Sequence, residues 1–256
     1  MRRKRMWRRW QAWVLLLPLL LIMTTAAVWN LCKSRTFQVA GVLVARVETE
    51  APMVALTFDD GPNANALAAL LPILAAHGVQ ATFFVTGAEL ERHPELGQQL
   101  LAAGHELGNH SFSHQRMVFK SAAFVENEIE RTDALIRAAG AEGEILFRPP
   151  YGAKGITLPR YLERTGRRTI MWDVEPDSKR GKTATSERIT ETTLAETRPG
   201  SIILLHVMYP SRQASLAAVP RIIEGLKARG YNFVTVSALL DSTSPTKAQP
   251  SAMPEA

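Results

Sequence analysis

Short apolar runs and longer amphipathic segments alternate along most of this chain. The short runs have the length and the β-branched or aromatic content of buried strands, and the segments between them repeat apolar residues at helical spacing. The predicted strands are Met53–Phe58, Ala81–Thr86, His105–Gly108, Ile145–Phe147, Arg168–Trp172, Ser201–Leu205 and Asn232–Val236. The predicted helices are Ala64–Ala76, Ala88–Ala103, Ser121–Ala139, Ile156–Arg164, Ser186–Glu196 and Gln213–Arg229. Because strands that alternate with single helices form parallel, right-handed units, about seven strands predict an α/β fold, an incomplete or distorted (β/α) barrel.

The segments outside this alternating region differ from it in composition. The chain has 256 residues, of which 46% are hydrophobic, and this favours one main domain from residue 53 to 240. Residues 33–52 are predicted to form a linker, with a short hairpin in the apolar stretch FQVAGVLVARVE. Residues 241–256 are rich in Ser, Pro and Ala and are predicted to be a disordered tail.

Residues 1–32 combine a basic flank with an apolar run, which is typical of a membrane-targeting helix. No charged residue occurs from Ala12 to Trp29, and the run is intermediate between a signal-peptide core and a membrane-spanning helix of about 17–25 residues. We favour an uncleaved signal anchor, because tryptophans flank the run, over a signal peptide cleaved near Thr25-Ala26-Ala27. Either alternative makes the membrane a partner and places the domain outside the cytoplasm, on the periplasmic or extracellular face.

The positive charge of the chain is concentrated at this N-terminus. The formal net charge is +6, and six Lys and Arg residues lie within the first nine positions, so the remaining 24 basic residues balance the 24 acidic ones. The predicted domain therefore shows no charge excess that would indicate nucleic-acid binding. Nothing in the sequence indicates an obligate protein partner. The single cysteine, Cys32, excludes an intramolecular disulfide.

Unusual polar residues follow five of the predicted strands. The carboxyl ends of parallel strands meet on one rim of a β/α barrel, so we expect these side chains to lie close together. They are Asp59, Asp60, His110, His114, Arg148, Tyr151, Asp173, Glu175, Asp177 and His206.

The adjacent carboxylates of Asp59 and Asp60 predict a cation at this rim, because two like charges at the end of a buried strand repel each other. His110 and His114 are separated by three residues, so on a helical turn both imidazoles project from one face and can bind one metal ion. One carboxylate completes the ligand set, and the other can accept a proton from water whose pKa the metal lowers to about 7. Mixed nitrogen and oxygen ligands favour Zn²⁺, with Co²⁺ or Ni²⁺ as alternatives.

Four motifs in this sequence resemble the successive motifs of the polysaccharide deacetylase family, which contains chitin and peptidoglycan deacetylases. They are TFDDGP at 57–62, HSFSH at 110–114, RPPYG at 148–152 and LLH at 204–206. The resemblance covers residues 54 to 240 and keeps the order of the family's motifs. It implies a metal-dependent hydrolase that removes N-acetyl groups from N-acetylglucosamine-type units of a glycan at the cell envelope.

The resemblance also implies roles for the motif residues. Asp59 would be the catalytic base, oriented and tuned by Arg148, and His206 would be the acid that protonates the leaving amine. The main-chain N–H of Tyr151 would help stabilise the oxyanion, and Leu204 would line the acetyl pocket. The implied metal ligands are Asp60, His110 and His114.

The sequence departs from the family pattern near the fifth predicted strand. Asp177-Ser178 stands where the family has Asp-Trp, and Val207 rather than Asp follows His206. We predict that Asp177 is the partner of Arg148 or His206, with Asp173 and Glu175 as alternatives. Three further histidines fit no motif: we expect His77 and His93 at the surface and His105 in a structural position.

Two alternatives to glycan N-deacetylation remain open. The chain can be a non-catalytic glycan-binding module that keeps the fold, although every metal and base position is occupied by the expected residue type. It can also be a deacylase that acts on another N-acyl amide. The sequence does not distinguish peptidoglycan, chitin-like oligomers and exported poly-N-acetylglucosamine as substrates.

Overall fold

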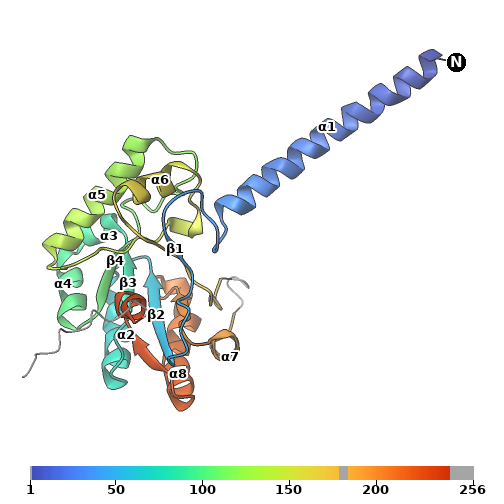
Figure 1. Ribbon diagram of the computed structural model, residues 1–256. Helices are drawn as coiled ribbons and strands as arrows, with labels where there is room; N and C mark the ends of the chain where they lie inside the picture. Colours follow the sequence, from blue (N-terminus) through green and yellow to red (C-terminus); the bar gives the residue numbers. More distant parts are fainter. Residues whose placement is uncertain (1, 179–183, 243–256) are drawn as a thin grey trace, which may run out of the picture.

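A parallel sheet forms the centre of the protein. The computed structural model describes residues 2–178 and 184–242 (Figure 1). The sheet has the strand order β4-β3-β2-β6, and β7 also pairs with β2 in parallel, while β1 and β5 form a separate parallel pair. The prediction of an α/β fold with parallel strands is confirmed. The strands are β1 (Leu43–Val44), β2 (Met53–Asp59), β3 (Thr82–Val85), β4 (Glu106–Asn109), β5 (Thr169–Ile170), β6 (Ile202–Leu205) and β7 (Asn232–Val234).

Isolated bridges connect the two sheets into a distorted barrel. Phe147 bridges Asn109 at the end of β4 and Thr169 in β5, and Val174 bridges Ile203 in β6. The predicted strand Ile145–Phe147 is wrong, because only Phe147 makes a bridge. Two prolines follow Arg148, and proline has no N–H to donate to a ladder, so the pairing does not continue beyond this point.

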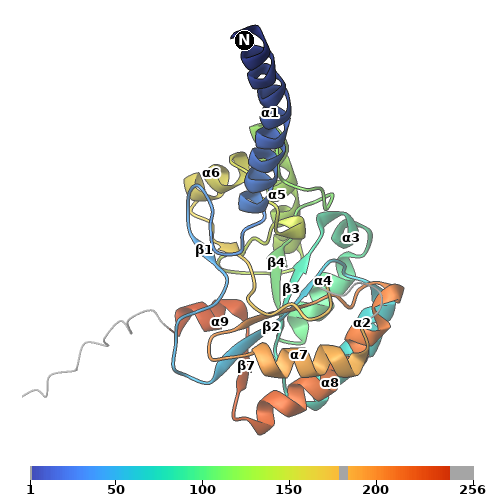
Figure 2. The same ribbon diagram turned by 90° about the vertical axis from the view of Figure 1, so that its right-hand side faces the viewer.

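Helices cover the outside of the sheet, and most predicted helices are present (Figures 1 and 2). The predicted helix Ala88–Ala103 is wrong as one element, because it breaks between His93 and Pro94, where His93 leaves the helical region at φ −136° and ψ 63°. A short helix after β7 was not predicted and packs against β2. The helices are α2 (Ala64–Ala76), α3 (Gly87–Arg92), α4 (Pro94–Ala102), α5 (Ala122–Ala138), α6 (Thr157–Arg164), α7 (Ser186–Glu196), α8 (Gln213–Ala228) and α9 (Val236–Asp241).

The two-residue period of β2 divides the core into an outer and an inner layer. Val54, Leu56 and Phe58 belong to the layer between the sheet and the surrounding helices. Ala55 belongs to the inner layer, where it packs with residues of β6 and with the apolar face of α9. Thr57 and Asp59 share the inward face of β2 with Ala55, so Asp59 stands at the carboxyl end of the barrel interior.

The N-terminal helix α1 (Arg2–Cys32) projects away from the barrel (Figures 1 and 2). Within the part of the chain that the structure describes, no helix combines the length and apolar character needed to cross a bilayer. The predicted membrane helix is therefore not confirmed. After α1, the predicted hairpin does not form: Leu43 and Val44 pair with β5, and Val47 is buried. Of the predicted tail, residues 243–256 lie outside the described residues.

His105 occupies a buried structural position, as predicted. Its Nδ1 accepts a hydrogen bond from the main-chain N–H of Ala81 at 3.2 Å, and its ring packs against Phe83. Burial lowers the pKa of His105 to about 4, so the ring is neutral in the folded protein. His77 is half-buried near Glu224, and His93 is exposed beside Glu95.

Candidate active site

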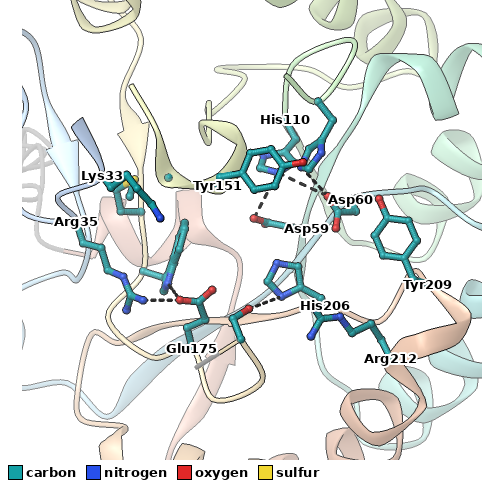
Figure 3. Close-up of a pocket in the computed structure, with 15 residues that line it drawn as sticks. Lys33, Arg35, Asp59, Asp60, His110, Tyr151, Glu175, His206, Tyr209 and Arg212 are labelled. Atoms are coloured by element: carbon teal, nitrogen blue, oxygen red, sulfur yellow. Dashed lines mark hydrogen bonds and ion pairs between the residues drawn. The ribbon is translucent and has the colours of Figure 1, made fainter. Parts of the chain in front are cut away.

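The two adjacent carboxylates face the same cleft because the chain turns sharply between them. In a continuing strand, neighbouring side chains point to opposite faces of the sheet. Here β2 ends at Asp59, and Asp60 adopts φ 70°, in the left-handed region that non-glycine residues seldom occupy. Gly61 follows at φ 74°, where an added Cβ would lie 2.8 Å from Met208 Cγ. This turn places Asp60 beside Asp59 at the carboxyl end of the barrel (Figure 3).

Asp60, His110 and His114 form a cluster that can hold a metal ion. One ligand atom from each residue lies within 4.8 Å of the others. Asp60 Oδ1 lies 3.1 Å from His114 Nε2 and 3.8 Å from His110 Nε2. His110 Nδ1 lies 2.8 Å from the main-chain oxygen of Arg148, which can only accept, so Nδ1 carries the proton. In the neutral ring, the Nε2 lone pair of His110 then faces the carboxylate.

The charges and contacts of this cluster fit a bound cation. Asp60 Oδ1 is buried and makes no hydrogen bond of acceptable geometry with any described residue. Burial raises the pKa of Asp60, but His114 and His110 outweigh it and hold the pKa below its usual value. Burial also lowers the pKa of His110, which favours the neutral ring despite the nearby carboxylates. An unsatisfied carboxylate oxygen opposite a neutral imidazole nitrogen is stabilised by a metal ion between them.

The loop between the two histidines is not a helical turn, so the predicted reason for their convergence is wrong. Residues 110–114 form an irregular loop in which Ser111 and His114 have φ of 65° and 56°. Ser111 Oγ accepts a hydrogen bond from the main-chain N–H of His114 at 3.2 Å. The buried Glu128 of α5 accepts hydrogen bonds from the N–H and the hydroxyl of Ser113, both at 2.8 Å. These contacts hold the loop in a shape that brings both rings to Asp60.

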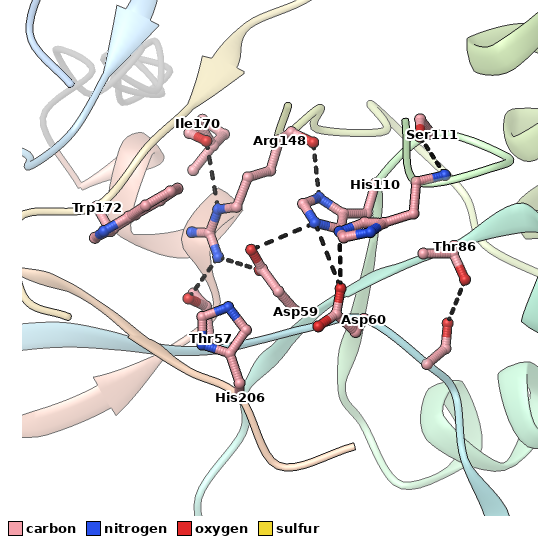
Figure 4. A network of polar contacts seen from close by, with 12 residues as sticks. Thr57, Asp59, Asp60, Thr86, His110, Ser111, Arg148, Ile170, Trp172 and His206 are labelled. Carbon is pink, nitrogen blue, oxygen red and sulfur yellow. Dashed lines mark hydrogen bonds and ion pairs between the residues drawn. The ribbon is translucent and has the colours of Figure 1, made fainter. Parts of the chain in front are cut away.

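Arg148 is fully buried and holds Asp59 (Figure 4). Its Nη1 donates to Asp59 Oδ1 at 2.6 Å and to Thr57 Oγ1 at 2.8 Å, and its Nη2 donates to the Met171 main-chain oxygen at 3.2 Å. The guanidinium also lies 3.9 Å from the centre of the Phe84 ring. The other oxygen, Asp59 Oδ2, lies 3.7 Å from His110 Nε2, so one side of Asp59 faces the candidate metal ligands.

His206 follows β6 and is paired with Asp177. Its Nδ1 lies 3.2 Å from Asp177 Oδ1, and its main-chain N–H donates to Asp177 Oδ2 at 2.7 Å. Ser215 Oγ also donates to Oδ2 of this carboxylate, at 2.9 Å. Burial alone lowers the pKa of His206, but the hydrogen bond and charge of Asp177, with Asp59 and Asp60, raise it to about 9.

The three carboxylates after the fifth predicted strand occupy different positions. Asp177 contacts His206, and no hydrogen bond or ion pair among the described residues joins Asp177 to Arg148. Asp173 accepts hydrogen bonds from Ser201 Oγ and the Ile202 N–H, both at 2.9 Å, and so holds the start of β6. Glu175 accepts a hydrogen bond from Trp172 Nε1 at 2.9 Å in the wall of the cleft. The geometry favours Asp177 as the partner of His206.

The cleft above these groups has a volume of about 550 Å³ and contains residues that the sequence did not single out. Tyr151 lines the cleft. It lies in the short 3₁₀ turn η1 (Pro150–Gly152), where its backbone adopts a positive φ of 58°. Leu204 does not line the cleft and is 1% exposed in the inner core layer. The lining residues outside the four motifs and the carboxylates after the fifth predicted strand are Lys33, Arg35, Met171, Trp172, Ser178, Tyr209 and Arg212. Lys33 and Arg35 were missed because they lie in the segment interpreted as a linker.

Comparison with known proteins identifies the family of this chain. Residues 46–170 match the family model for polysaccharide deacetylase. The chain is 32% identical over 200 residues to a peptidoglycan-N-acetylglucosamine deacetylase of Bacillus cereus, an alignment that covers 78% of this chain and 93% of the relative. The chain belongs to the polysaccharide deacetylase family. It is also 36% identical over 201 residues to a chitooligosaccharide deacetylase of Sinorhizobium fredii, covering 73% of this chain and 92% of that relative.

Solved structures of polysaccharide deacetylases share this fold. The Bc1960 peptidoglycan N-acetylglucosamine deacetylase superposes with a TM-score of 0.72 at 29% identity, covering 76% of this chain and 91% of the other. A family 4 pseudoenzyme of Bacillus anthracis, BA3943, superposes with a TM-score of 0.70 at 27% identity, covering 80% and 70%. Similarity to the family therefore does not by itself distinguish an enzyme from a non-catalytic relative, and the site residues of this chain must make that distinction.

Proposed function

We propose that this polysaccharide deacetylase hydrolyses N-acetyl groups of N-acetylglucosamine-type units in a glycan. One observation carries the proposal: the Asp60–His110–His114 cluster lines one cleft together with Asp59 and His206. The buried Arg148 and Asp177 hold these two side chains. This arrangement offers a metal site, a base and an acid for amide hydrolysis. The names of the relatives support N-acetylglucosamine as the unit that is acted on.

Asp59 is the proposed base. Arg148 holds Oδ1 of Asp59 and leaves Oδ2 directed toward the candidate metal ligands. A water at that position can transfer a proton to Oδ2. Thr57 and the main-chain oxygen of Met171 fix the guanidinium in turn, so Asp59 is oriented through a fully buried side chain. The imidazolium of His206, held by Asp177, is the proposed acid that protonates the leaving amine. The N–H of Tyr151 is the proposed donor to the oxyanion.

Asp60, His110 and His114 would hold the divalent metal. When bound there, a metal ion polarises the acetyl carbonyl and lowers the pKa of water. We propose Zn²⁺, with Co²⁺ or Ni²⁺ able to substitute, because imidazole and carboxylate ligands suit all three ions.

We expect exhaustive chelation to abolish acetate release from N-acetylglucosamine oligomers. Addition of Zn²⁺, Co²⁺ or Ni²⁺ should restore it, because imidazole and carboxylate ligands suit all three ions. Acetate release and bound metal are measured on the same samples, with a His114→Ala variant as a control that should not be restored at the same metal concentration. Full activity in metal-free protein would contradict the proposed site. Metal binding without release of any acyl group would favour the non-catalytic glycan-binding alternative, and release of another N-acyl group would favour the other deacylase.

We propose that residues 1–32 anchor the protein in a membrane and place the domain on its periplasmic or extracellular face. The basic flank, the uncharged run Ala12–Trp29 and the exposed apolar side chains between Leu17 and Leu31 on the projecting helix α1 support this proposal. The peptidoglycan relative supports a location at the cell envelope.

An uncleaved anchor predicts that the cellular protein sediments with membranes and resists extraction by high salt. Its N-terminus should be Met1 or the residue that follows it. A variant without residues 1–32 that is expressed in the cytoplasm serves as the soluble control. N-terminal sequencing decides between the two alternatives: a mature N-terminus near Val28 would show a cleaved signal peptide instead.

A further inference from the structure

The segment that follows α1 forms one wall of the cleft. Lys33 and Arg35 line the cleft on the side opposite Tyr209 and Arg212, with Asp59 and Asp60 between the two sides (Figure 3). This segment belongs to the region interpreted from the sequence as a linker. It therefore contributes side chains to the surface of the cleft.

A buried lysine fastens this wall to the loop that carries Tyr151. Lys154 is 1% exposed, and its Nζ donates a hydrogen bond to the main-chain oxygen of Ser34. Its main-chain N–H donates to the Cys32 oxygen at 3.0 Å. A lysine is seldom fully buried unless it has a partner, so this contact defines the position of residues 32–35. Lys33 is thereby held next to η1.

Arg35 also lines this wall of the cleft, and its charge is paired with a carboxylate of the protein. Its Nη2 pairs with Glu175 Oε2, and its guanidinium lies 5.0 Å from the centre of the Trp172 ring. Glu175 also accepts the hydrogen bond from Trp172 Nε1. The charge of Arg35 is therefore matched within the protein, and its contacts join this segment to Trp172 and Glu175.

Lys33 differs from Arg35 because its charge is not matched. The side chain is exposed on the cleft, and no carboxylate among the described residues lies within ion-pair distance of its Nζ. On the opposite side, Arg212 Nη1 donates only to the main-chain oxygen of Asp177, at 3.2 Å, so it too lacks a carboxylate partner in the described part of the chain. Among the described residues, the cleft thus presents two cations without a carboxylate partner beside the proposed catalytic groups.

We propose that Lys33 binds a carboxylate carried by the glycan next to the N-acetylated unit, which makes it a specificity-determining residue for acidic over neutral substrates. This inference rests on the proposed function and deepens it by naming the substrate class. The ammonium of lysine is a compact charge at the end of a flexible side chain. It can therefore follow a carboxylate on a sugar substituent, because that carboxylate moves with rotation about the bonds that link it to the ring. The guanidinium of Arg35 is already paired with Glu175, so Lys33 supplies the unpaired charge on this wall of the cleft.

The test compares two glycans that differ only in charge. One is an oligosaccharide of N-acetylated hexosamines in which alternate rings carry a lactyl ether carboxylate, and the other is the same oligosaccharide with each carboxylate converted to a carboxamide. Acetate release gives kcat/KM for each, and calorimetry gives Kd for each without requiring turnover. Both are measured for the wild type, Lys33→Ala, Lys33→Glu and the control Lys227→Ala. Lys227 lies outside the cleft and contacts the main-chain oxygen of His77.

We expect the wild type to prefer the carboxylate form and Lys33→Ala to reduce that preference about two- to fivefold, the effect of one exposed ion pair. Lys33→Glu should reduce it about tenfold or more, because attraction becomes repulsion. The difference between variants should shrink at about 0.5 M salt, where the Debye length is only a few ångström. Lys227→Ala should keep the wild-type preference.

The outcomes separate this inference from the proposed function. A preference that is absent in the wild type, or equal in the wild type and both Lys33 variants, overturns the role of Lys33 even when acetate is released. Failure to bind either glycan overturns it as well. A preference in Kd that depends on Lys33, without acetate release from either form, supports the carboxylate subsite and contradicts the proposed deacetylation.

Discussion

Replacing Asp59 with Asn should reduce acetate release by about 10²–10⁴-fold or more while leaving the metal content of the protein close to that of the wild type. Asp60, His110 and His114 converge, whereas Asp59 lies beside this cluster, with Oδ1 held by Arg148 at 2.6 Å and Oδ2 3.7 Å from His110 Nε2. Asn keeps an oxygen that can accept the hydrogen bond from Arg148 but is a much weaker base. The measurement is bound metal per chain together with the rate of acetate release.

Asp60→Asn is the matched control, because it changes the neighbouring carboxylate in the same way. We expect this variant to lose metal affinity and, for that reason, activity. Metal titration should then restore Asp60→Asn partly and Asp59→Asn not at all. Equal loss of metal in the two variants would show that the aspartates do not divide their roles as proposed.

The stability of the Asp59→Asn variant is part of this experiment. Removing one partner of a buried ion pair costs about 3–5 kcal/mol, because the remaining charge is left unpaired. Arg148 is fully buried, but it also donates to Thr57 Oγ1 and to the main-chain oxygen of Met171. These contacts should keep the loss below that of a lone buried pair. A thermal unfolding curve of each variant distinguishes a folded, inactive protein from an unfolded one.

The sequence predicted the site better than it predicted the backbone that builds the site. The motif residues lie at the ends of strands, and the parallel topology brings these ends to one rim, so the pattern alone grouped Asp59, His110, Arg148 and His206. The local geometry was not predictable in the same way. The convergence of His110 and His114 depends on an irregular loop with two positive φ angles, held by Glu128 of the following helix, α5.

The segment after α1 shows why other residues of the cleft were missed. Its composition resembles that of a linker, and its ordered position depends on a lysine more than a hundred residues later in the chain. Lys33 and Arg35 carry no motif, so only the tertiary contacts of Lys154 and Glu175 reveal that they line the cleft. The predicted strand Ile145–Phe147 is reduced to bridges at Phe147, and the prolines after Arg148 prevent the ladder from continuing beyond it.

Replacing His206 with Ala should cost about 10²–10⁴-fold in the rate of N-deacetylation, with metal binding unchanged, because an amine leaves poorly without a proton. His206 lies outside the ligand cluster, and its Nδ1 is held by Asp177 at 3.2 Å. The loss should be smaller for an O-acetyl substrate. An alkoxide is a better leaving group than an unprotonated amine nitrogen, so its departure depends less on a proton from the enzyme. An equal loss on N-acetyl and O-acetyl substrates would argue that His206 is structural.

The pH dependence tests the role of His206 without removing the ring. Its pKa is raised from 6.5 to about 9, so the acid is protonated at neutral pH and loses its proton as the pH rises through that value. The kcat/KM for N-deacetylation should therefore fall on the alkaline side.

A bound dication repels the imidazolium and moves this fall toward lower pH, so the decisive quantity is the difference between two proteins measured with the same metal. Asp177→Asn removes the carboxylate that favours the imidazolium and should move the alkaline fall to lower pH than in the wild type. Ser215→Ala, which removes a different hydrogen bond to Asp177, is the control and should move it less. An alkaline fall at the same pH in Asp177→Asn and the wild type would mean that the leaving-group proton comes from another residue.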